Sequence, residues 1–252
     1  MADGRYPLGI DIGGSGIKGA PVDLGTGTFT AERYRRETPS ESTPAAVADI
    51  VAEVATHFAD QTGDSPVGIT LPSVVSGGVV RTAANIDKSW IGTDAVALFQ
   101  QRLGRPVTLL NDADAAGVAE LHYGAARGHR GLVFVATLGT GIGTVLLNHG
   151  YLVPNSELGH VELNGVDAET RTAHSARERE GLSYEEWAER LQRYFSYIEN
   201  LLWPDLIVVG GGVSKKADRF LPLLHLRAPI VPAQLLNSAG IVGAAWLAVN
   251  GD

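Results

Sequence analysis

Two glycine-rich turns, each next to apolar runs, place the strongest constraint on the fold of this chain. The first is Asp11–Lys18 (DIGGSGIK), with apolar residues on both sides, and the second is Thr137–Gly143 (TLGTGIG), which follows the apolar run 132–136. Each pattern predicts a strand, a turn without bulky side chains and a second strand. Backbone N–H groups at such a turn can approach an anion closely, and glycine also permits positive φ. Two such hairpins far apart in the chain predict two lobes that hold one phosphate chain.

The residues around the first turn suit phosphoryl transfer. Asp11 precedes the turn, where a carboxylate can hold hydrated Mg²⁺, and Ser15 and Lys18 add a hydroxyl and a cation. The predicted phosphate-binding residues of the two turns are Asp11, Gly13, Gly14, Ser15, Gly16, Lys18, Thr137, Gly139, Thr140 and Gly141. The residues after Gly16 favour a strand and not a helix, so the turn is neither a P-loop nor a dinucleotide-binding fingerprint. For each turn taken alone, a plain tight hairpin is the alternative.

Composition excludes several classes of protein. The chain has 252 residues, 44% of them apolar, a net charge of −8 and no cysteine. Without cysteine there is neither a disulfide framework nor a thiolate metal site, and the negative charge argues against general nucleic-acid binding. No apolar stretch reaches the length of a membrane span, and no cationic and apolar leader opens the chain. We therefore expect a cytoplasmic protein without a membrane or nucleic-acid partner.

Apolar periodicity predicts alternating strands and helices in both halves of the chain. The expected strands cover residues 28–35, 67–71, 78–82, 107–110, 132–136, 143–147 and 205–209. The expected helices cover 44–58, 94–103, 183–202, 215–224 and 239–249, and Pro222 is expected to break the fourth of them. Thr43 before Pro44 is a typical helix start. The segment 168–181 is charged and poor in apolar periodicity, so we expect it to be a mobile surface segment.

The pair Asn111-Asp112 closes a predicted strand and is the first catalytic candidate. In α/β proteins the carboxyl ends of strands are the usual place for ligands. Phosphoryl transfer to an alcohol needs a carboxylate within reach of the attacking hydroxyl, and Asp112 suits that role. Asn111 could bind another sugar hydroxyl. The alternative is that the pair caps the next helix.

Two further segments carry polar groups next to glycine. Glu157-Leu158-Gly159-His160 places a carboxylate and an imidazole where they could both bind a polyol, and Glu169 follows nearby. A turn with surface charges is the alternative. Gly210-Gly211-Gly212 precedes a predicted helix that carries Lys215, Lys216 and Arg219, and a helix N-terminus favours anions. We predict phosphate binding by Gly211, Gly212, Lys215 and Lys216. The alternative is a tight turn with solvated lysines. For the other basic clusters, at 33–36, 127–130 and 177–179, the alternative is a solvated face.

Taken together, these motifs resemble the ROK family, whose kinases belong to the actin-like, ribonuclease H-like superfamily. The matching segments run in family order along nearly the whole chain and are Asp11–Lys18, Asn111-Asp112, Thr137–Gly143, Glu157–His160 and Gly210–Gly212. The resemblance is closest to the branch of actinobacterial polyphosphate glucokinases, to which the segments 11–23, 154–162, 192–201 and 208–224 are also similar.

The resemblance implies a two-lobed actin-like sugar kinase with an interlobe cleft. The small N-terminal lobe would comprise residues 1–110, with the C-terminal helix 239–252 packed back on it, and the large lobe residues 111–238. Asp112 would be the general base. The implied hexose-binding residues are Asn85, Asn111, Asp112, Glu157, His160 and Glu169. Zinc-binding ROK proteins have a Cys-rich motif after the His of Glu-x-Gly-His; this chain has none, so we expect Mg²⁺ and no zinc.

The implied reaction transfers the terminal phosphoryl group of inorganic polyphosphate, with ATP as a possible second donor, to the 6-hydroxyl of glucose. The family also implies a homodimer. A strictly ATP-dependent hexokinase is the main alternative. A sugar-sensing ROK regulator is the remote one, because such regulators carry a helix-turn-helix domain ahead of the first hairpin and the first strand here begins by about residue 7.

Overall fold

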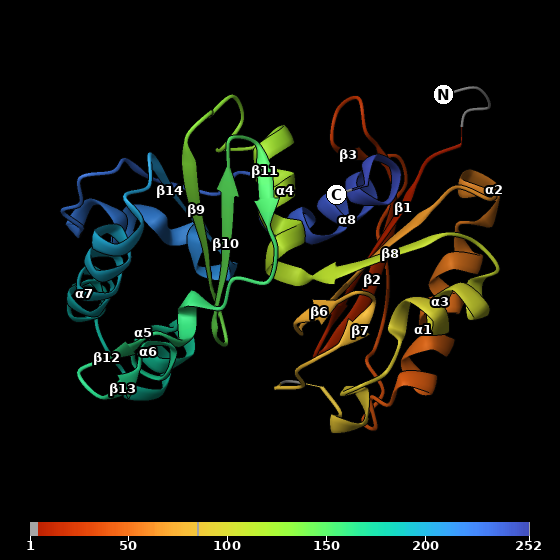
Figure 1. The fold of residues 1–252 in the computed structure, drawn as a ribbon, viewed down its shortest axis with the longest axis horizontal. Coiled ribbons are helices and arrows are strands. Elements are labelled where there is room, and N and C mark those ends of the chain that lie inside the picture. Colours follow the sequence, from red (N-terminus) through yellow and green to blue (C-terminus); the bar gives the residue numbers. More distant parts are fainter. Residues whose placement is uncertain (1–4, 85, 252) are drawn as a thin grey trace. The chain divides into compact units, whose positions relative to one another are not determined.

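The computed structural model describes residues 5–84 and 86–251, and these residues form two compact units (Figure 1). One unit comprises residues 1–119 and 238–252, and the other comprises residues 120–237. The division falls inside helix α4 (Asp112–Tyr123), whereas the sequence analysis placed the lobe boundary between residues 110 and 111. Asn85 lies outside the described residues. Among the described residues, no helix is long and apolar enough to cross a membrane.

A six-stranded sheet forms the centre of the first unit. Its order is β3-β2-β1-β5-β8, and β4 also pairs with β2. The strands are β1 (Leu8–Gly13), β2 (Gly16–Asp23), β3 (Thr28–Phe29), β4 (Tyr34–Arg36), β5 (Val67–Leu71) and β8 (Val107–Asn111). β1 and β2 are the antiparallel arms of the predicted hairpin, and β1, β5 and β8 run parallel. The carboxyl ends of β1, β5 and β8 therefore lie at one edge of this sheet, and β8 delivers Asn111 there.

Helices α1 and α3 of the first unit lie within one residue of their predicted bounds. The Thr43 hydroxyl caps α1 (Pro44–His57), the Asp94 carboxylate caps α3 (Ala95–Leu103), and Gly104 ends α3 in the left-handed conformation. The smaller elements are α2 (Ala59–Thr62), η1 (Lys88–Trp90) and the hairpin β6 (Val75–Ser76) and β7 (Val79–Val80). The strand predicted over 78–82 is thus only the two residues of β7. The strand predicted over 28–35 is wrong in extent, because bends at residues 30 and 31 separate β3 from β4.

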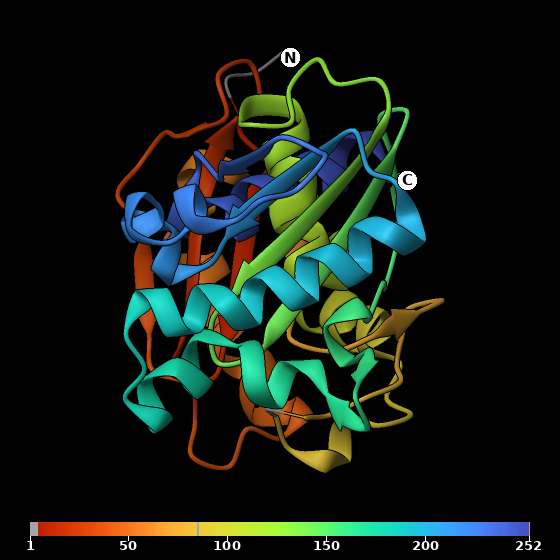
Figure 2. The same cartoon turned by 90° about the vertical axis from the view of Figure 1, so that its left-hand side faces the viewer.

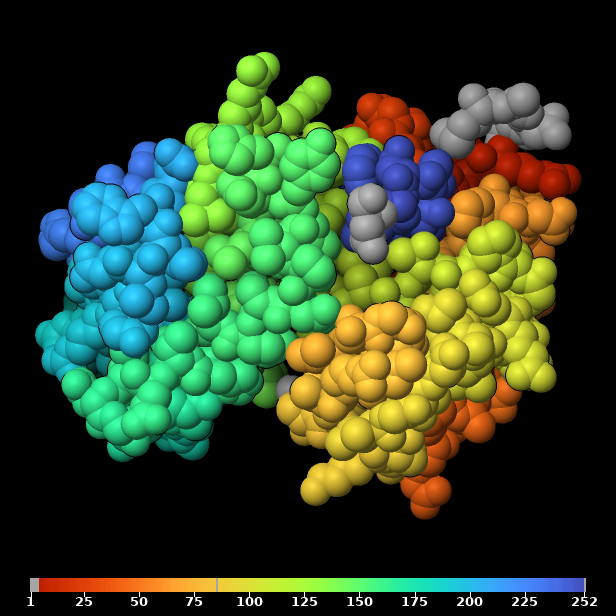
Figure 3. Space-filling model, in the orientation of Figure 1, coloured from red at the N-terminus to blue at the C-terminus, as the bar shows by residue number. Residues whose placement is uncertain are grey.

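The C-terminal helix α8 (Ala239–Asn250) packs on the first sheet with almost no space between them. A Cβ atom added to Gly9 would overlap the carbonyl group of Ile241, and one added to Gly68 would overlap that of Ala244. Gly243 of α8 lies equally close to the Ala115 carbonyl of α4. Figure 3 shows the other side of α8, in dark blue, at the surface. These glycines let the helix backbone lie directly on β1 and β5.

A five-stranded sheet with the order β11-β10-β9-β14-β15 forms the second unit. Its strands are β9 (Leu132–Leu138), β10 (Ile142–Asn148), β11 (Tyr151–Val153), β14 (Leu206–Gly210) and β15 (Ile230–Pro232). The long helix α7 (Tyr184–Leu202) starts with a capping box between Ser183 and Glu186 and crosses in front of the strands in Figure 2. Its buried face, which includes Trp187, Leu191 and Phe195, belongs to the same core as the sheet.

Two predictions for the second unit are wrong. The segment 168–181, expected to be mobile, forms α5 (Ala168–Thr172) and α6 (His174–Glu180), because Ala168, Ala173 and Ala176 are buried in the core. The helix expected over 215–224, with a break at Pro222, is instead two 3₁₀-helices, η3 (Gly212–Arg219) and η4 (Leu221–Leu223). They divide at Phe220, and η3 has a further kink at Lys216. Pro222 has no backbone N–H, so it cannot take part in the hydrogen-bond pattern of a continuous α-helix. The remaining elements are η2 (Leu158–His160), β12 (Glu162–Leu163), β13 (Val166–Asp167) and η5 (Leu236–Ser238).

The close approach of α8 yields a stability prediction. Gly68→Ala should lower the free energy of unfolding by about 1–3 kcal/mol, because the added methyl group must push α8 away from β5. The matched control is Gly14→Ala, since Gly14 has no atom within 4 Å of an added Cβ. Urea unfolding of both variants measures the difference. Similar stability of Gly68→Ala and wild type would contradict the packing described here.

Candidate active site

The carboxylate of Asp11 is held in place at the end of β1 by two neighbouring strands. The hydroxyl of Thr70, on β5, donates to Asp11 Oδ1 at 2.8 Å. Lys18, the register partner of Asp11 on β2, places its Nζ 3.7 Å from Asp11 Oδ2. Thr70 is fully buried, whereas the Asp11 side chain is a quarter exposed. The sequence did not reveal Thr70, because only the parallel pairing of β1 with β5 brings it here.

The tip of the first turn is fixed by side chains that follow β2. Arg35 Nη2 donates to the carbonyl of Ser15 at 2.6 Å, and the Thr38 hydroxyl donates to the carbonyl of Gly13. The Arg35 guanidinium also occupies the space that a Cβ on Gly16 would need. None of Gly13, Gly14 and Gly16 has positive φ. Gly16 therefore provides space for the Arg35 guanidinium, and none of the three glycines supplies the left-handed backbone that the sequence allowed for.

Asn111 caps helix α4. Its Oδ1 accepts from the backbone N–H groups of Ala113, at 2.8 Å, and Asp114, at 3.3 Å, while its Nδ2 donates to the carbonyl of Ser73 at 3.2 Å. The alternative that the sequence left open, a helix cap, is thus what Asn111 does. The next residue, Asp112, is exposed in the first turn of α4, and its Oδ1 also accepts from the Ala113 N–H.

The second glycine turn, in the second unit, is held by α5 and α6. Glu169 Oε2 accepts from the backbone N–H of Ile142 at 2.7 Å and lies where a Cβ on Gly141 would stand. Ser175 donates its N–H to the carbonyl of Gly139 and its hydroxyl to the carbonyl of Thr140, at 3.0 and 2.6 Å. Glu169 was predicted to bind hexose; the structure gives it a contact with the second glycine turn that the sequence did not suggest.

The segment that carries Glu157 and His160 is tied to strand β10. The Thr144 hydroxyl donates to the Ser156 carbonyl and accepts from the Leu158 N–H, and the Ser156 hydroxyl donates back to the Thr144 carbonyl. Gly159 is buried against the Ile142 carbonyl, where no side chain fits. The second glycine turn and the predicted hexose segment therefore share the single strand β10.

Glu157, His160 and Glu169 lie close enough to interact electrostatically. His160 Nε2 is 3.9 Å from Glu157 Oε2, and His160 Nδ1 is 2.8 Å from Asp167 Oδ2. The hydrogen bond to Asp167 raises the pKa of His160, and the nearby carboxylates of Glu169, Asp167 and Glu157 add to this effect. Burial raises the pKa of Glu157, the charge of Glu169 raises it further, and His160 opposes both. Asp167, which orients His160, was missed by the sequence analysis.

The third glycine segment also meets the second turn. Gly211 has a φ of 84° and lies against the Leu138 carbonyl, and Gly210 pairs with Thr137 in the sheet. Lys215 and Lys216 follow on η3 with exposed side chains. Because η3 is a kinked 3₁₀-helix, the α-helix N-terminus that was expected to attract anions is not formed. Any anion binding here must come from the lysines and the glycine N–H groups.

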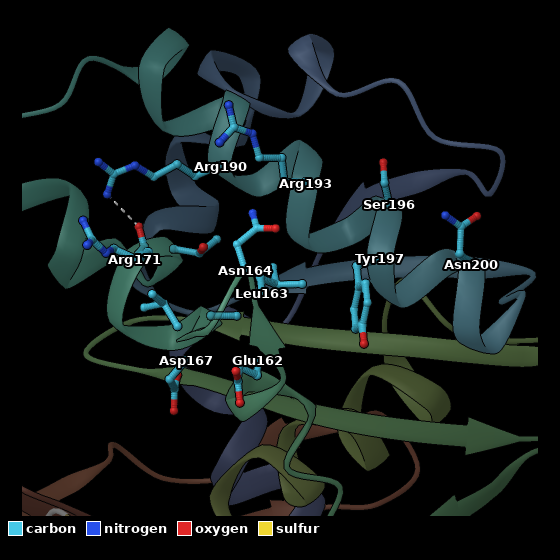
Figure 4. Close-up of a pocket in the computed structure, with 13 residues that line it drawn as sticks. Glu162, Leu163, Asn164, Asp167, Arg171, Arg190, Arg193, Ser196, Tyr197 and Asn200 are labelled. Atoms are coloured by element: carbon cyan, nitrogen blue, oxygen red, sulfur yellow. Dashed lines mark hydrogen bonds between the residues drawn. The ribbon is translucent and has the colours of Figure 1, made fainter.

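A pocket of about 670 Å³ is lined in part by Asp167, but none of the predicted site residues that the structure describes lines it (Figure 4). It is lined by the β12–β13 hairpin, α5 and α7, and it shares only Asp167 with the contacts described above. Figure 4 shows Asp167 and Glu162 directed away from Arg190 and Arg193. Of these arginines, Arg190 is paired with Glu180 at 2.6 Å.

Comparison with known proteins identifies the class and then the family. The fold is that of the two-lobed actin-like sugar kinases. The inorganic polyphosphate/ATP-glucomannokinase of Arthrobacter sp. strain KM matches with a TM-score of 0.91 and 55% identity, over 96% of this chain and 97% of that one. A ROK family glucokinase from Streptomyces griseus, solved with glucose and AMPPNP, matches in fold with a TM-score of 0.83 and 24% identity, over 98% and 100% of the two chains.

Sequence comparison agrees with the fold. The ROK family model matches residues 7–174, so this chain belongs to the ROK family, as its motifs predicted. A polyphosphate glucokinase of Mycobacterium tuberculosis is 52% identical over 246 residues, which cover 97% of this chain and 92% of the relative.

The His160–Asp167 pair yields a pH prediction. Because the pKa of His160 is raised in the folded protein, the contribution of this pair to stability is complete below about pH 6.5, the ordinary value for histidine. It is lost as the pH rises through the raised pKa of the folded state. Asp167→Asn removes the charge but keeps an oxygen for the Glu169 N–H, which Asp167 Oδ1 accepts. Its destabilisation, measured by thermal unfolding, should therefore shrink as the pH rises.

An NMR titration of His160 supplies the second readout for this prediction. In Asp167→Asn its pKa should fall towards the ordinary value of histidine. A loss of stability that does not depend on pH, with an unchanged His160 titration, would show that Asp167 acts only as the cap of α5.

Proposed function

We propose that this protein transfers the terminal phosphoryl group of inorganic polyphosphate to the 6-hydroxyl of glucose and so forms glucose 6-phosphate. The Mycobacterium and Arthrobacter relatives, by their names, use polyphosphate, and both cover nearly the whole chain at more than half identity. The observation that carries the proposal is the hydrogen bond that the Ile142 N–H donates to Glu169. It joins a segment with polyol-binding chemistry to a phosphate-binding turn.

In this mechanism Asp112 accepts the proton of the attacking hydroxyl while Asn111, by capping α4, fixes the position of Asp112. Glu157 and His160 would bind hydroxyl groups of the hexose, and Glu169 would be the third residue of this set. Asn85 stays a proposed hexose residue. The N–H groups of residues 13–16 and 139–143 would hold the donor phosphates, and such fixed dipoles stabilise charge that develops in the transition state.

Mg²⁺ fits the residues near Asp11. The Asp11 carboxylate is partly exposed. Its Oδ1 accepts a hydrogen bond from Thr70, whereas its Oδ2 lies 3.7 Å from Lys18 Nζ, which is too far for a hydrogen bond. In the described part of the chain, no group of three His, Cys, Asp or Glu residues could hold a metal ion by itself. This suits Mg²⁺, which keeps several waters and binds through one or two carboxylates and substrate phosphates. Bound there, the ion would neutralise charge on the transferred phosphoryl group; the absence of zinc stays a prediction.

A coupled assay of glucose 6-phosphate, with polyphosphate and ATP compared in parallel, tests the proposal. We expect Mg²⁺-dependent product formation from polyphosphate. ATP is the second candidate donor, because the Arthrobacter relative is named for both. Activity with ATP alone would overturn the polyphosphate proposal and favour an ATP-dependent hexokinase. The homodimer and the cytoplasmic location stay predictions.

Asp112→Asn tests the general base. The substitution keeps the size of the side chain and can still accept from the Ala113 N–H, but it cannot take a proton. We expect kcat to fall by at least about 100-fold, the lower range for general-base catalysis, while glucose still binds. Steady-state kinetics and a glucose-binding titration measure the two effects. A kcat close to that of wild type would end the assignment.

A further inference from the structure

Two arginines from different elements share one tyrosine ring in the second unit. The guanidinium carbon of Arg177, on α6, lies 3.9 Å from the ring centroid of Tyr184, and that of Arg219, on η3, lies 4.4 Å from it. Tyr184 is the first residue of α7, only 4% exposed, and its ring is parallel to that of Phe220 within 10°. The ring is therefore a rigid platform on which two cations meet.

Carboxylates do not balance this positive charge. Within the described residues, Arg177, Arg219, Lys215 and Lys216 form no ion pair, and the buried Nε of Arg177 has no hydrogen-bond partner. Glu178, the acidic neighbour of Arg177, lies 3.8 Å from His174 instead. Two like charges repel, and each cation–π contact contributes only about 0.5–2 kcal/mol. A bound anion would relieve the repulsion at this platform.

Both elements that carry these arginines, α6 and η3, contact the second glycine turn near their first residues. Ser175, two residues before Arg177, holds the carbonyls of Gly139 and Thr140. On the other side, η3 begins next to Gly211, which lies against Leu138. Lys216 of η3 is close enough to His174 of α6 for its charge to lower the pKa of that histidine, after the larger effect of burial. Cations thus extend from the turn along two adjoining elements.

We propose that Arg177 and Arg219, positioned by Tyr184 and supported by Lys216, bind donor phosphates that lie beyond the one being transferred. This inference rests on the proposed function, because it takes polyphosphate as the ligand. A long polyphosphate carries many charged phosphates beyond the one being transferred, whereas tripolyphosphate carries only two. The platform would therefore favour long donors.

The test compares the KM for long-chain polyphosphate and for tripolyphosphate in Arg177→Gln/Arg219→Gln and in Arg219→Gln alone. Arg219 is exposed, so the single variant should fold normally. For the double variant we expect the KM for long chains to rise about tenfold at low ionic strength, since two charged contacts are lost. The rise should shrink in high salt, because screening weakens the same attraction. The KM for glucose should not change.

Two control variants separate the platform from general charge effects. Tyr184→Phe keeps the ring face and should behave like wild type. Arg193→Gln removes the same charge from an exposed position on α7, about 13 Å further along the helix, and should leave the KM for polyphosphate unchanged. An equal rise in KM for Arg193→Gln would overturn the inference, and so would a double variant that uses long chains normally at low salt.

Failure of the proposed function is recognised separately. If wild type forms no glucose 6-phosphate from polyphosphate, the function proposal fails, and calorimetric titration of long-chain polyphosphate into wild type and the double variant decides the inference. Binding that is about tenfold weaker in the double variant would support the platform. Equal binding, or none to wild type, would overturn it.

Discussion

The hydrogen bond from the Ile142 N–H to Glu169 joins the two proposed binding segments of the second unit. It fixes the end of the glycine turn at residues 139–141, and its acceptor belongs to the first turn of α5. The cap of α5 is Asp167, whose second oxygen holds His160. One short chain of contacts therefore runs from the proposed hexose residue to the proposed donor turn. Loss of a partner from a bond to a charged group typically costs about 1.5–3 kcal/mol, so this link should resist distortion.

The predicted hexose segment is held by hydrogen bonds and close packing. Thr144 and Ser156 exchange hydrogen bonds, Tyr194 OH donates to the Leu158 carbonyl at 3.3 Å, and Gly159 lies on Ile142. Tyr194 is fully buried on α7, so the segment is also connected to the main core of the unit. These contacts involve neutral groups and should persist across a wide pH range. The titratable part of the segment is confined to its exposed end, at Glu157 and His160.

The sequence predicted those features that depend on neighbours along the chain. The hairpins at Asp11–Lys18 and Thr137–Gly143, the cap at Thr43 and the buried face of α7 all follow from local periodicity and turn chemistry. It could not predict Thr70 beside Asp11, because that contact depends on parallel strands far apart in sequence.

Composition led to a wrong prediction for the charged segment 168–181. Three buried alanines, at 168, 173 and 176, order a segment whose many charged residues predicted mobility. The residues of the candidate site were predicted by type, but the sequence did not indicate which contacts position them. Asp167, Ser175 and Tyr184 were all missed for this reason, since each acts on a residue that lies elsewhere in the chain or on another element.

The cap on α4 shows how one residue can serve both the fold and the proposed chemistry. Asn111 ends β8 and satisfies two N–H groups at the start of α4, so the chain passes from strand to helix without an intervening loop. This transition leaves Asp112 in the first helical turn, exposed, where the helix dipole favours a negative charge. The amide of Asn111 also donates to the Ser73 carbonyl, which fixes the cap to the segment after the neighbouring strand β5. A structural cap and a catalytic carboxylate are therefore not competing explanations of the Asn-Asp pair, because the cap determines where the carboxylate lies.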